Sequence, residues 1–301
     1  MHDEAQIRPQ NGITTSEDKK LLAVCPKCKG NKTIKKGFRS TAQRGKQQRY
    51  LCKKCEFAFT VDNGFWKMKK NEDKICQAID TYFEGLSLRK VKRNFFKYGD
   101  LMISHQSVLN WLRKYSYLIG KYVSTLQPQL SGHYMTDEVI IQCAGKKHNF
   151  GAILDKHTRY IVATRYSEKE YITSEDNIEL WSEAEKIHRP YKLSSDNHKT
   201  YPEAFNKVFW SRYKDRKVEH NIINTLKTGR HNYIMERVWN TLRERIKIMR
   251  GFKAPWSAKL LIDGFFIWYN FIRPHMKFNE TPSRRAGLMV GELKEIINLS
   301  C

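Results

Sequence analysis

Two Cys-x-x-Cys pairs near the start of the chain constrain its folding most strongly. Cys25 and Cys28 form the first pair, Cys52 and Cys55 form the second, and 23 residues separate the pairs. A thiolate pair with this spacing chelates one ion through a tight turn, and two such pairs complete a tetrahedral zinc site. Four unpaired thiols or a redox pair are the alternative, which leaves the doubled spacing unexplained. We therefore expect a zinc ribbon over residues 21–65, in which structural Zn²⁺ supplies the folding free energy.

The charge of the chain predicts a polyanionic partner. Lys and Arg number 55 against 31 Asp and Glu, a net charge of +24, and cations placed on phosphates release condensed counterions. The segment between the cysteine pairs holds eight Lys or Arg and no Asp or Glu. It is either a solvated charge run or, as we expect, a hairpin that contacts phosphate through Lys35, Lys36, Arg39 and Arg49. No apolar run of about 18 residues and no signal-peptide pattern indicates a membrane partner.

Residues 70–122 have the pattern of three helices, and residues 1–20 lack apolar periodicity and are expected to form a flexible tail. Ser87 and Ser104 are candidate N-caps for the second and third helices. The outward residues of the third helix can read base edges or hold phosphates. Many small helical bundles share this pattern, but behind a basic zinc ribbon it favours a helix-turn-helix DNA-binding domain. The candidate DNA contacts on the third helix are Gln106, Arg113 and Lys114.

Residues 130–295 alternate strands and helices. Three early strands, a crossover helix and further strands and helices predict an α/β core of ribonuclease-H-like order. The fold class is therefore multidomain α/β, with a ribonuclease-H-like core that follows a zinc ribbon and a helix-turn-helix domain.

Two acidic residues of this core stand out by their positions. Asp137 lies inside the first strand among apolar neighbours, where a hard cation would explain its charge. Glu138 points to the opposite face if the strand is regular. Asp196 ends a strand at the carboxyl edge, where α/β sheets place their sites, although it could also be only a helix N-cap.

A third acid comes from the helix predicted near residues 230–250. Its apolar residues recur at steps of three and four and define a buried stripe. At about 100° per residue, Glu236 lies at the border of that stripe and Glu244 on the solvent face. We therefore assign Glu236 to the site, and Glu244 to surface salt bridges. Three carboxylates on suitable elements can hold two Mg²⁺ ions.

Together these signatures resemble those of DDE transposases from prokaryotic insertion sequences, which share an integrase-like core. They are Asp137 in MTDE, Asp196 in SSDNHKTY and Glu236 in YIMERVWNTLRERIKIMRGFK, and WYNFIRPHMKFNETP resembles the end of that core. The resemblance covers about residues 130–290. It implies that the three acids are the catalytic residues and hold Mg²⁺ or Mn²⁺.

The resemblance also implies partners and DNA contacts. Arg243, seven residues after Glu236, is expected to contact DNA near the cleavage site, and Lys199 and Tyr201 match the stretch after the second acid. The partners are double-stranded DNA, as terminal inverted repeats and target, and further copies of the chain on that DNA. The location is the prokaryotic cytoplasm and nucleoid.

Four functions compete at this point. The first is a transposase that cleaves element ends and joins the freed 3′-hydroxyl to target DNA. The second is a catalytically inactive, transposase-derived DNA-binding regulator, which leaves the three acids unexplained. A nuclease on the same core would cleave without joining. An RNA-binding ribbon protein fits the charge and the zinc site only.

Overall fold

The computed structural model describes residues 23–41, 45–65, 68–99, 101–223, 232–249 and 251–300, so the tail expected over residues 1–20 lies outside the described part. The chain divides into two compact units, Met1–Asp62 and Asn63–Cys301. Within the described residues, no helix is both long and apolar enough to cross a membrane.

The first unit is a small antiparallel sheet joined to the cysteine pairs. Strand β1 (Thr33–Thr41) pairs with β2 (Gly45–Cys52), which pairs with β3 (Ala58–Thr60). Its buried residues are few, and Cys25 and Cys52 are two of the four. So small a core is insufficient to fold a segment of this length by burial alone.

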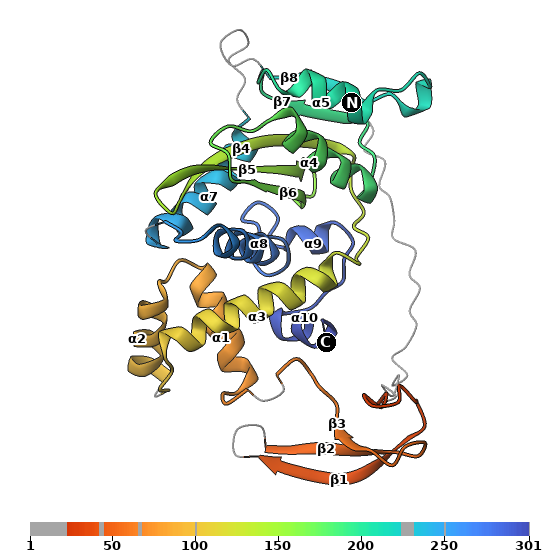
Figure 1. The fold of residues 1–301 in the computed structure, drawn as a ribbon, viewed down its shortest axis with the longest axis vertical. Coiled ribbons are helices and arrows are strands. Elements are labelled where there is room, and N and C mark those ends of the chain that lie inside the picture. The colour runs from red at the N-terminus through yellow and green to blue at the C-terminus, as the bar shows by residue number, and fades with distance from the viewer. Residues whose placement is uncertain are drawn as a thin grey trace, which may run out of the picture. The chain divides into compact units, whose positions relative to one another are not determined.

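The second unit begins with the three predicted helices, α1 (Glu72–Phe83), α2 (Leu88–Gly99) and α3 (His105–Val123). The expected N-caps are present. The Ser87 hydroxyl accepts a hydrogen bond from the amide of Lys90, and the Ser104 hydroxyl accepts one from the amide of Ser107. These helices share one core with the rest of the unit. Figure 1 shows α8 (Pro255–Phe271) between α3 and the large sheet. Gly264 permits this approach, because a Cβ there would collide with the Ser116 side chain.

The large sheet has the strand order β6-β5-β4-β7-β8. Its strands are β4 (His133–Cys143), β5 (Lys146–Asp155), β6 (Ile161–Ser167), β7 (Lys192–Ser195) and β8 (Glu219–Ile222). The first three are antiparallel, β7 runs parallel to β4, and β8 runs parallel to β7. Three antiparallel strands extended by two parallel ones form the predicted ribonuclease-H-like order.

Helices cover both faces of this sheet. They are α4 (Ser174–Ile187), α5 (Tyr201–Phe209), α7 (Tyr233–Met249) and α8, and two short segments, α9 (Pro282–Arg285) and α10 (Leu293–Leu299), follow. A 3₁₀ turn, η1 (Lys214–Arg216), precedes β8. Phe150 on β5 packs on Trp239 of α7 and Phe266 of α8, whereas a Cβ at Gly151 would meet Leu180 of α4. Since successive strand residues face opposite ways, α4 lies on one face and α7 with α8 on the other.

Candidate functional site

Asp137 lies on β4, on the face of the sheet that α7 covers. It pairs in register with Ala152, and Val139, two residues on, pairs with Phe150. The indole Nε1 of Trp239 donates to Oδ2 of Asp137 at 3.1 Å, and the amide of Glu138 donates to Oδ1 at 2.9 Å. Each carboxylate oxygen therefore has one fixed donor, which holds the group in one orientation.

Glu138 lies on the opposite face, as strand alternation predicts. It pairs with Gly151, and its carboxylate accepts a hydrogen bond from the hydroxyl of Tyr201 on α5. The sequence did not reveal this pair, because a phenol and a carboxylate 63 positions apart leave no local signal.

Asp196 follows the last residue of β7, next to β4 in the sheet. Its side chain is exposed, and Oδ1 accepts the amide of His198 at 3.1 Å. This bond stabilises the turn that leads into α5. Asp196 therefore also has a local structural role, close to the helix-capping role considered from the sequence. A turn role and a ligand role are compatible, because the carboxylate retains a second oxygen.

The electrostatics show that these carboxylates lie within reach of one another. Burial, then the charge of Glu138, raises the pKa of Asp137 to about 7, and Asp196 adds to the effect. Burial also raises the pKa of Glu138 to about 7, against the Tyr201 hydrogen bond, and Asp196 adds again. Three acids on two neighbouring strands therefore repel one another in the absence of a cation.

Glu236 is exposed in the first turn of α7, a helix that two contacts fix against β4. Asn232 donates to the carbonyl of Thr136 at 3.2 Å, and Trp239 donates to Asp137. Glu236 is four residues after Asn232 and three before Trp239, so all three lie on one side of the helix. The register of α7 thus directs this side toward the middle of β4, where Asp137 lies.

The two residues of the core that are predicted to contact DNA, Lys199 and Arg243, are exposed. Lys199 lies in the turn before α5, and Arg243 on α7 donates from Nη1 to Asn240 at 3.2 Å. Glu244 is exposed too, as the helical phase predicts.

The three acids do not form a closed cage. In the described part of the chain, the only group of three or more His, Cys, Asp or Glu side chains whose ligand atoms all lie within 4.8 Å is the cysteine cluster. Asp137 and Asp196 are brought together by neighbouring strands, and Glu236 lies on the adjoining helix. An open set of carboxylates with waters completing the sphere is typical of Mg²⁺ sites.

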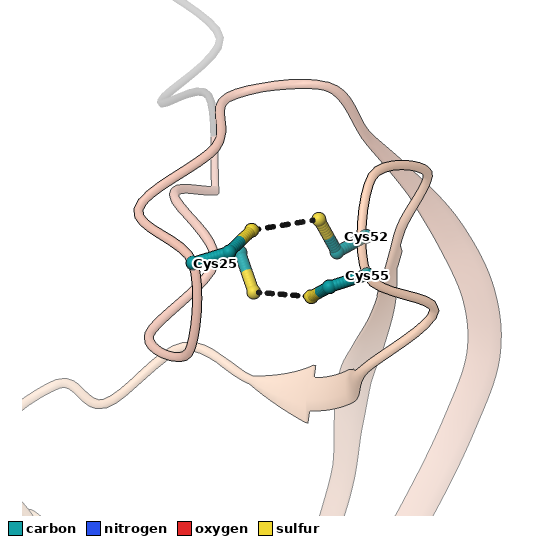
Figure 2. A group of neighbouring side chains, drawn as sticks. Cys25, Cys52 and Cys55 are labelled. Carbon is teal, nitrogen blue, oxygen red and sulfur yellow. Dashed lines mark hydrogen bonds between the residues drawn. The ribbon is translucent and has the colours of Figure 1, made fainter.

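The four cysteines do converge. Sγ of Cys25 lies 3.6 Å from that of Cys55, and Sγ of Cys28 lies 3.5 Å from that of Cys52. Figure 2 shows Cys25 opposite Cys52 and Cys55, with the sulfurs directed into one small space. Although burial opposes it, the amides of Cys55 and Lys54 lower the pKa of Cys52 to about 7. This geometry matches a tetrahedral thiolate site for one metal ion.

The predicted basic contacts of the first unit are accessible. Lys35, Lys36 and Arg39 on β1 are exposed, and Arg49 on β2 is half-buried. On α3, Gln106 is exposed and hydrogen-bonds to Asn110. The other two predicted contacts of α3 already have intramolecular partners. Arg113 stacks on Trp256 with 4.8 Å from its guanidinium carbon to the ring centre, and Lys114 donates to the carbonyl of Gly64 at 2.9 Å.

The part of the chain that carries the three acids is similar to known proteins. A family model described as a DDE domain matches residues 131–275. The uncharacterized 48.3 kDa protein of insertion element ISM1 from Methanobrevibacter smithii is 29% identical over 150 residues. That match covers 44% of this chain and 36% of the relative, so the chain spans only about a third of the relative's length.

Solved integrase cores are also similar. The HTLV-2 integrase catalytic core domain in complex with magnesium is 13% identical, with a TM-score of 0.39, over 53% of this chain and 99% of that one. The BIV integrase catalytic core domain is 12% identical, with a TM-score of 0.38, over 52% and 93%. Because both scores are below 0.5, the fold assignment depends on the strand order. The family match confirms the resemblance to DDE transposases with a ribonuclease-H-like core.

Proposed function

We propose that this chain, whose residues 131–275 match a family model described as a DDE domain, catalyses DNA transposition by metal-dependent cleavage at element ends and 3′-hydroxyl strand transfer. The observation that carries the proposal is the raised pKa of Asp137, a half-buried carboxylate whose two oxygens are held by Trp239 and the Glu138 amide. None of the ion pairs among the described residues includes Asp137. Asp137 instead faces Asp196, which is the arrangement a divalent ion stabilises.

In the proposed site Asp137, Asp196 and Glu236 hold Mg²⁺ or Mn²⁺. Hard carboxylate oxygens suit these ions, and the mutual repulsion of the acids is the charge that a cation would neutralise. When bound, the ions stabilise developing negative charge on the phosphodiester oxygens.

Other side chains of the protein orient the carboxylates and are proposed to hold the DNA. Trp239 keeps the Asp137 carboxylate in one rotamer, and Tyr201 keeps Glu138 directed away from it. Arg243 and Lys199, both exposed, are proposed to hold the DNA backbone beside the acids. Phosphate contacts of this kind fix register and orientation.

The proposal extends to the other parts of the chain. Cys25, Cys28, Cys52 and Cys55 are proposed to hold structural Zn²⁺, which makes residues 21–65 a zinc ribbon. The hairpin cations and the exposed residues of α3 are proposed to bind the terminal repeats, α2 and α3 acting as a helix-turn-helix. Two element ends must be held at once, so we expect a homo-oligomer on DNA.

A strand-transfer assay tests the function. Purified protein is incubated with Mg²⁺, labelled DNA carrying the element's own ends and a target plasmid, beside Glu236→Gln and the matched Glu244→Gln. We expect wild type and Glu244→Gln to join the 3′ end to target, and Glu236→Gln to lose joining by at least about 100-fold. Cleavage without joining by wild type would instead indicate a nuclease.

One observation favours a second candidate, a catalytically inactive DNA-binding regulator. Among the described residues, Asp137, Asp196 and Glu236 do not form a group whose ligand atoms all lie within 4.8 Å, as the four cysteines do. If all three proteins bind the element ends and none cuts or joins, the regulator is the better assignment.

A further inference from the structure

A basic cavity lies on the other side of Glu236 from Asp137. It has a volume of about 390 Å³, and its walls come from the turn after β5, from α7, and from the end of α8 with the segment that follows. The cations that line it are Arg159, Arg237, Arg273 and Lys277, and no Asp or Glu is among the lining residues.

Two acids act on these cations at longer range than an ion pair, Asp155 on Arg159 and Glu84 on Arg273. In the part of the chain that the structure describes, none of the four forms an ion pair, and Arg237 donates only to the sulfur of Met276 at 3.6 Å. Arg159 is half-buried, and its Nη1 is fully buried with no hydrogen-bond partner. A buried guanidinium donor without an acceptor costs free energy, which an incoming anion would offset.

The turn between β5 and β6 fixes the backbone of Arg159. This residue has a φ of +64°, and its amide donates to the carbonyl of Asp155 at 2.9 Å. The turn therefore sets the position from which the Arg159 side chain reaches the cavity wall.

Two neutral side chains of the cavity, Tyr269 and His275, have pKa values that the four cations influence. Burial raises the pKa of Tyr269 to about 12, and Arg273, Arg159 and Arg237 all act against that shift. Burial and then the surrounding cations lower the pKa of His275 to about 4. Nδ1 of His275 accepts the amide of Lys277 at 3.3 Å, so the neutral ring presents Nε2–H as a further donor.

The rim adds apolar surface. Tyr233 is 65% exposed and Met276 is 78% exposed, and both line the cavity. An exposed aromatic ring beside a group of cations suits a nucleic acid strand, since bases stack on such rings.

The phase of α7 connects this cavity with the candidate catalytic edge. Tyr233, Arg237 and Thr241 recur at steps of four and line the cavity, whereas Asn232 and Trp239 face β4. At about 100° per residue, Glu236 lies between these two sides of the helix. The cavity and the candidate catalytic edge therefore lie on adjoining sides of α7.

We infer that this cavity binds a backbone phosphate of the DNA on which the protein acts, held by Arg159, Arg237, Arg273 and Lys277; the inference rests on the proposed function. A free phosphate or a nucleotide shares the same chemistry, and the test below separates these sources.

The test compares two double variants of equal charge. Arg237→Gln/Lys277→Gln removes the two exposed cations of the cavity, and Lys186→Gln/Lys207→Gln removes two exposed cations of α4 and α5. Thermal melting checks that both are folded. Binding of fluorescein-labelled duplex DNA is then followed by anisotropy over a range of salt concentrations, and binding of inorganic phosphate by calorimetry.

We expect the cavity variant to bind DNA about tenfold more weakly and to lower the salt slope by about one, with the control unchanged. A neutral methylphosphonate placed at one backbone position is expected to weaken wild type and not the cavity variant. If both double variants weaken DNA binding equally, the inference fails. It also fails if the cavity variant loses inorganic phosphate but binds DNA normally.

Failure of the proposed function has a different result. Glu236→Gln removes no cation and is expected to bind DNA like wild type. If it also joins strands like wild type, the catalytic assignment falls, while the comparison of the two double variants still decides the cavity.

Discussion

The indole of Trp239 donates a 3.1 Å hydrogen bond to Oδ2 of Asp137, and it does so from the helix that carries Glu236. One bond thus sets both the orientation of a candidate metal ligand and the register of α7 on β4. Trp239 is 1% exposed and also packs edge-on against Phe150 and Phe266. Packing and the polar bond therefore depend on the same side chain.

Trp239→Phe is expected to separate these two roles. The phenyl ring of the variant can still pack on Phe150 and Phe266, so the loss of stability should be about 1–2 kcal/mol. The folded protein should therefore still bind DNA. Strand joining should fall by at least about tenfold, since the Asp137 carboxylate loses its fixed donor. Trp268→Phe is the matched control, because Trp268 is also buried, at 4% exposed, and its indole donates to Asp80 of α1 at 2.8 Å, away from the candidate site. Equal effects of both variants on joining would contradict a positioning role for Trp239.

The raised pKa of Asp137 predicts how stability changes with pH in the absence of metal. Between the ordinary value of 3.8 and about 7 the folded state holds a proton that the unfolded state has lost. Stability should therefore fall as pH rises through this window, by several kcal/mol in total with Glu138. The loss should persist above pH 7, where both folded carboxylates are ionised.

Mg²⁺ is expected to reverse that loss. In chelator, wild type should melt at a lower temperature near pH 8 than near pH 5, and Mg²⁺ should raise the pH 8 value. Asp137→Asn should show a smaller pH dependence and no Mg²⁺ effect. A melting temperature of wild type that does not respond to Mg²⁺ near pH 8 would count against metal binding by these acids.

The period of the apolar residues was sufficient to predict most of the core. The three helices of residues 70–122, the three early strands, the crossover helix α4 and the helix α7 follow the patterns of the sequence, as does the border position of Glu236. The same pattern failed at Arg245, which is 2% exposed on α7 and covers the Tyr82 ring at 3.7 Å. A second helix, α1, packs on that side of α7, and the periodicity of one helix contains no information about such a neighbour.

The candidate site was predictable to a similar extent. Strand ends and helical phase predicted the positions of the acids. They did not predict which groups orient the carboxylates. The Trp239 indole and the Tyr201 hydroxyl reach their partners across 102 and 63 positions of the chain. The basic cavity likewise joins residues of three segments, so none of its cations could be distinguished from surface charge in the sequence alone.

The cysteine cluster predicts that each chain binds one zinc ion and that losing this ion unfolds only the first unit. We expect one Zn²⁺ per chain by elemental analysis, and Cys52→Ser should lose it because one tetrahedral ligand is gone. DNA binding should weaken, since metal binding folds the unit that carries the basic hairpin. The unit Asn63–Cys301 should keep its melting transition, because the two units have separate cores. Cys143→Ser, in the core of the second unit, is the control and should keep the zinc.

The Tyr201 hydroxyl predicts a stability effect that depends on pH. Tyr201→Phe leaves the half-buried Glu138 carboxylate without its side-chain donor, so the folded pKa of Glu138 should rise further above its usual value. Destabilisation should be small near pH 5, where the folded carboxyl is protonated, and about 1–3 kcal/mol near pH 8, where it must ionise. Tyr160→Phe removes the hydroxyl of another buried tyrosine, which packs on Phe271 of α8, and should change stability little at either pH. Chemical denaturation of both variants at the two pH values measures the difference. If Tyr201→Phe destabilises equally at both, the phenol contributes packing alone, and Glu138 must be directed away from Asp137 by the strand geometry without help from α5.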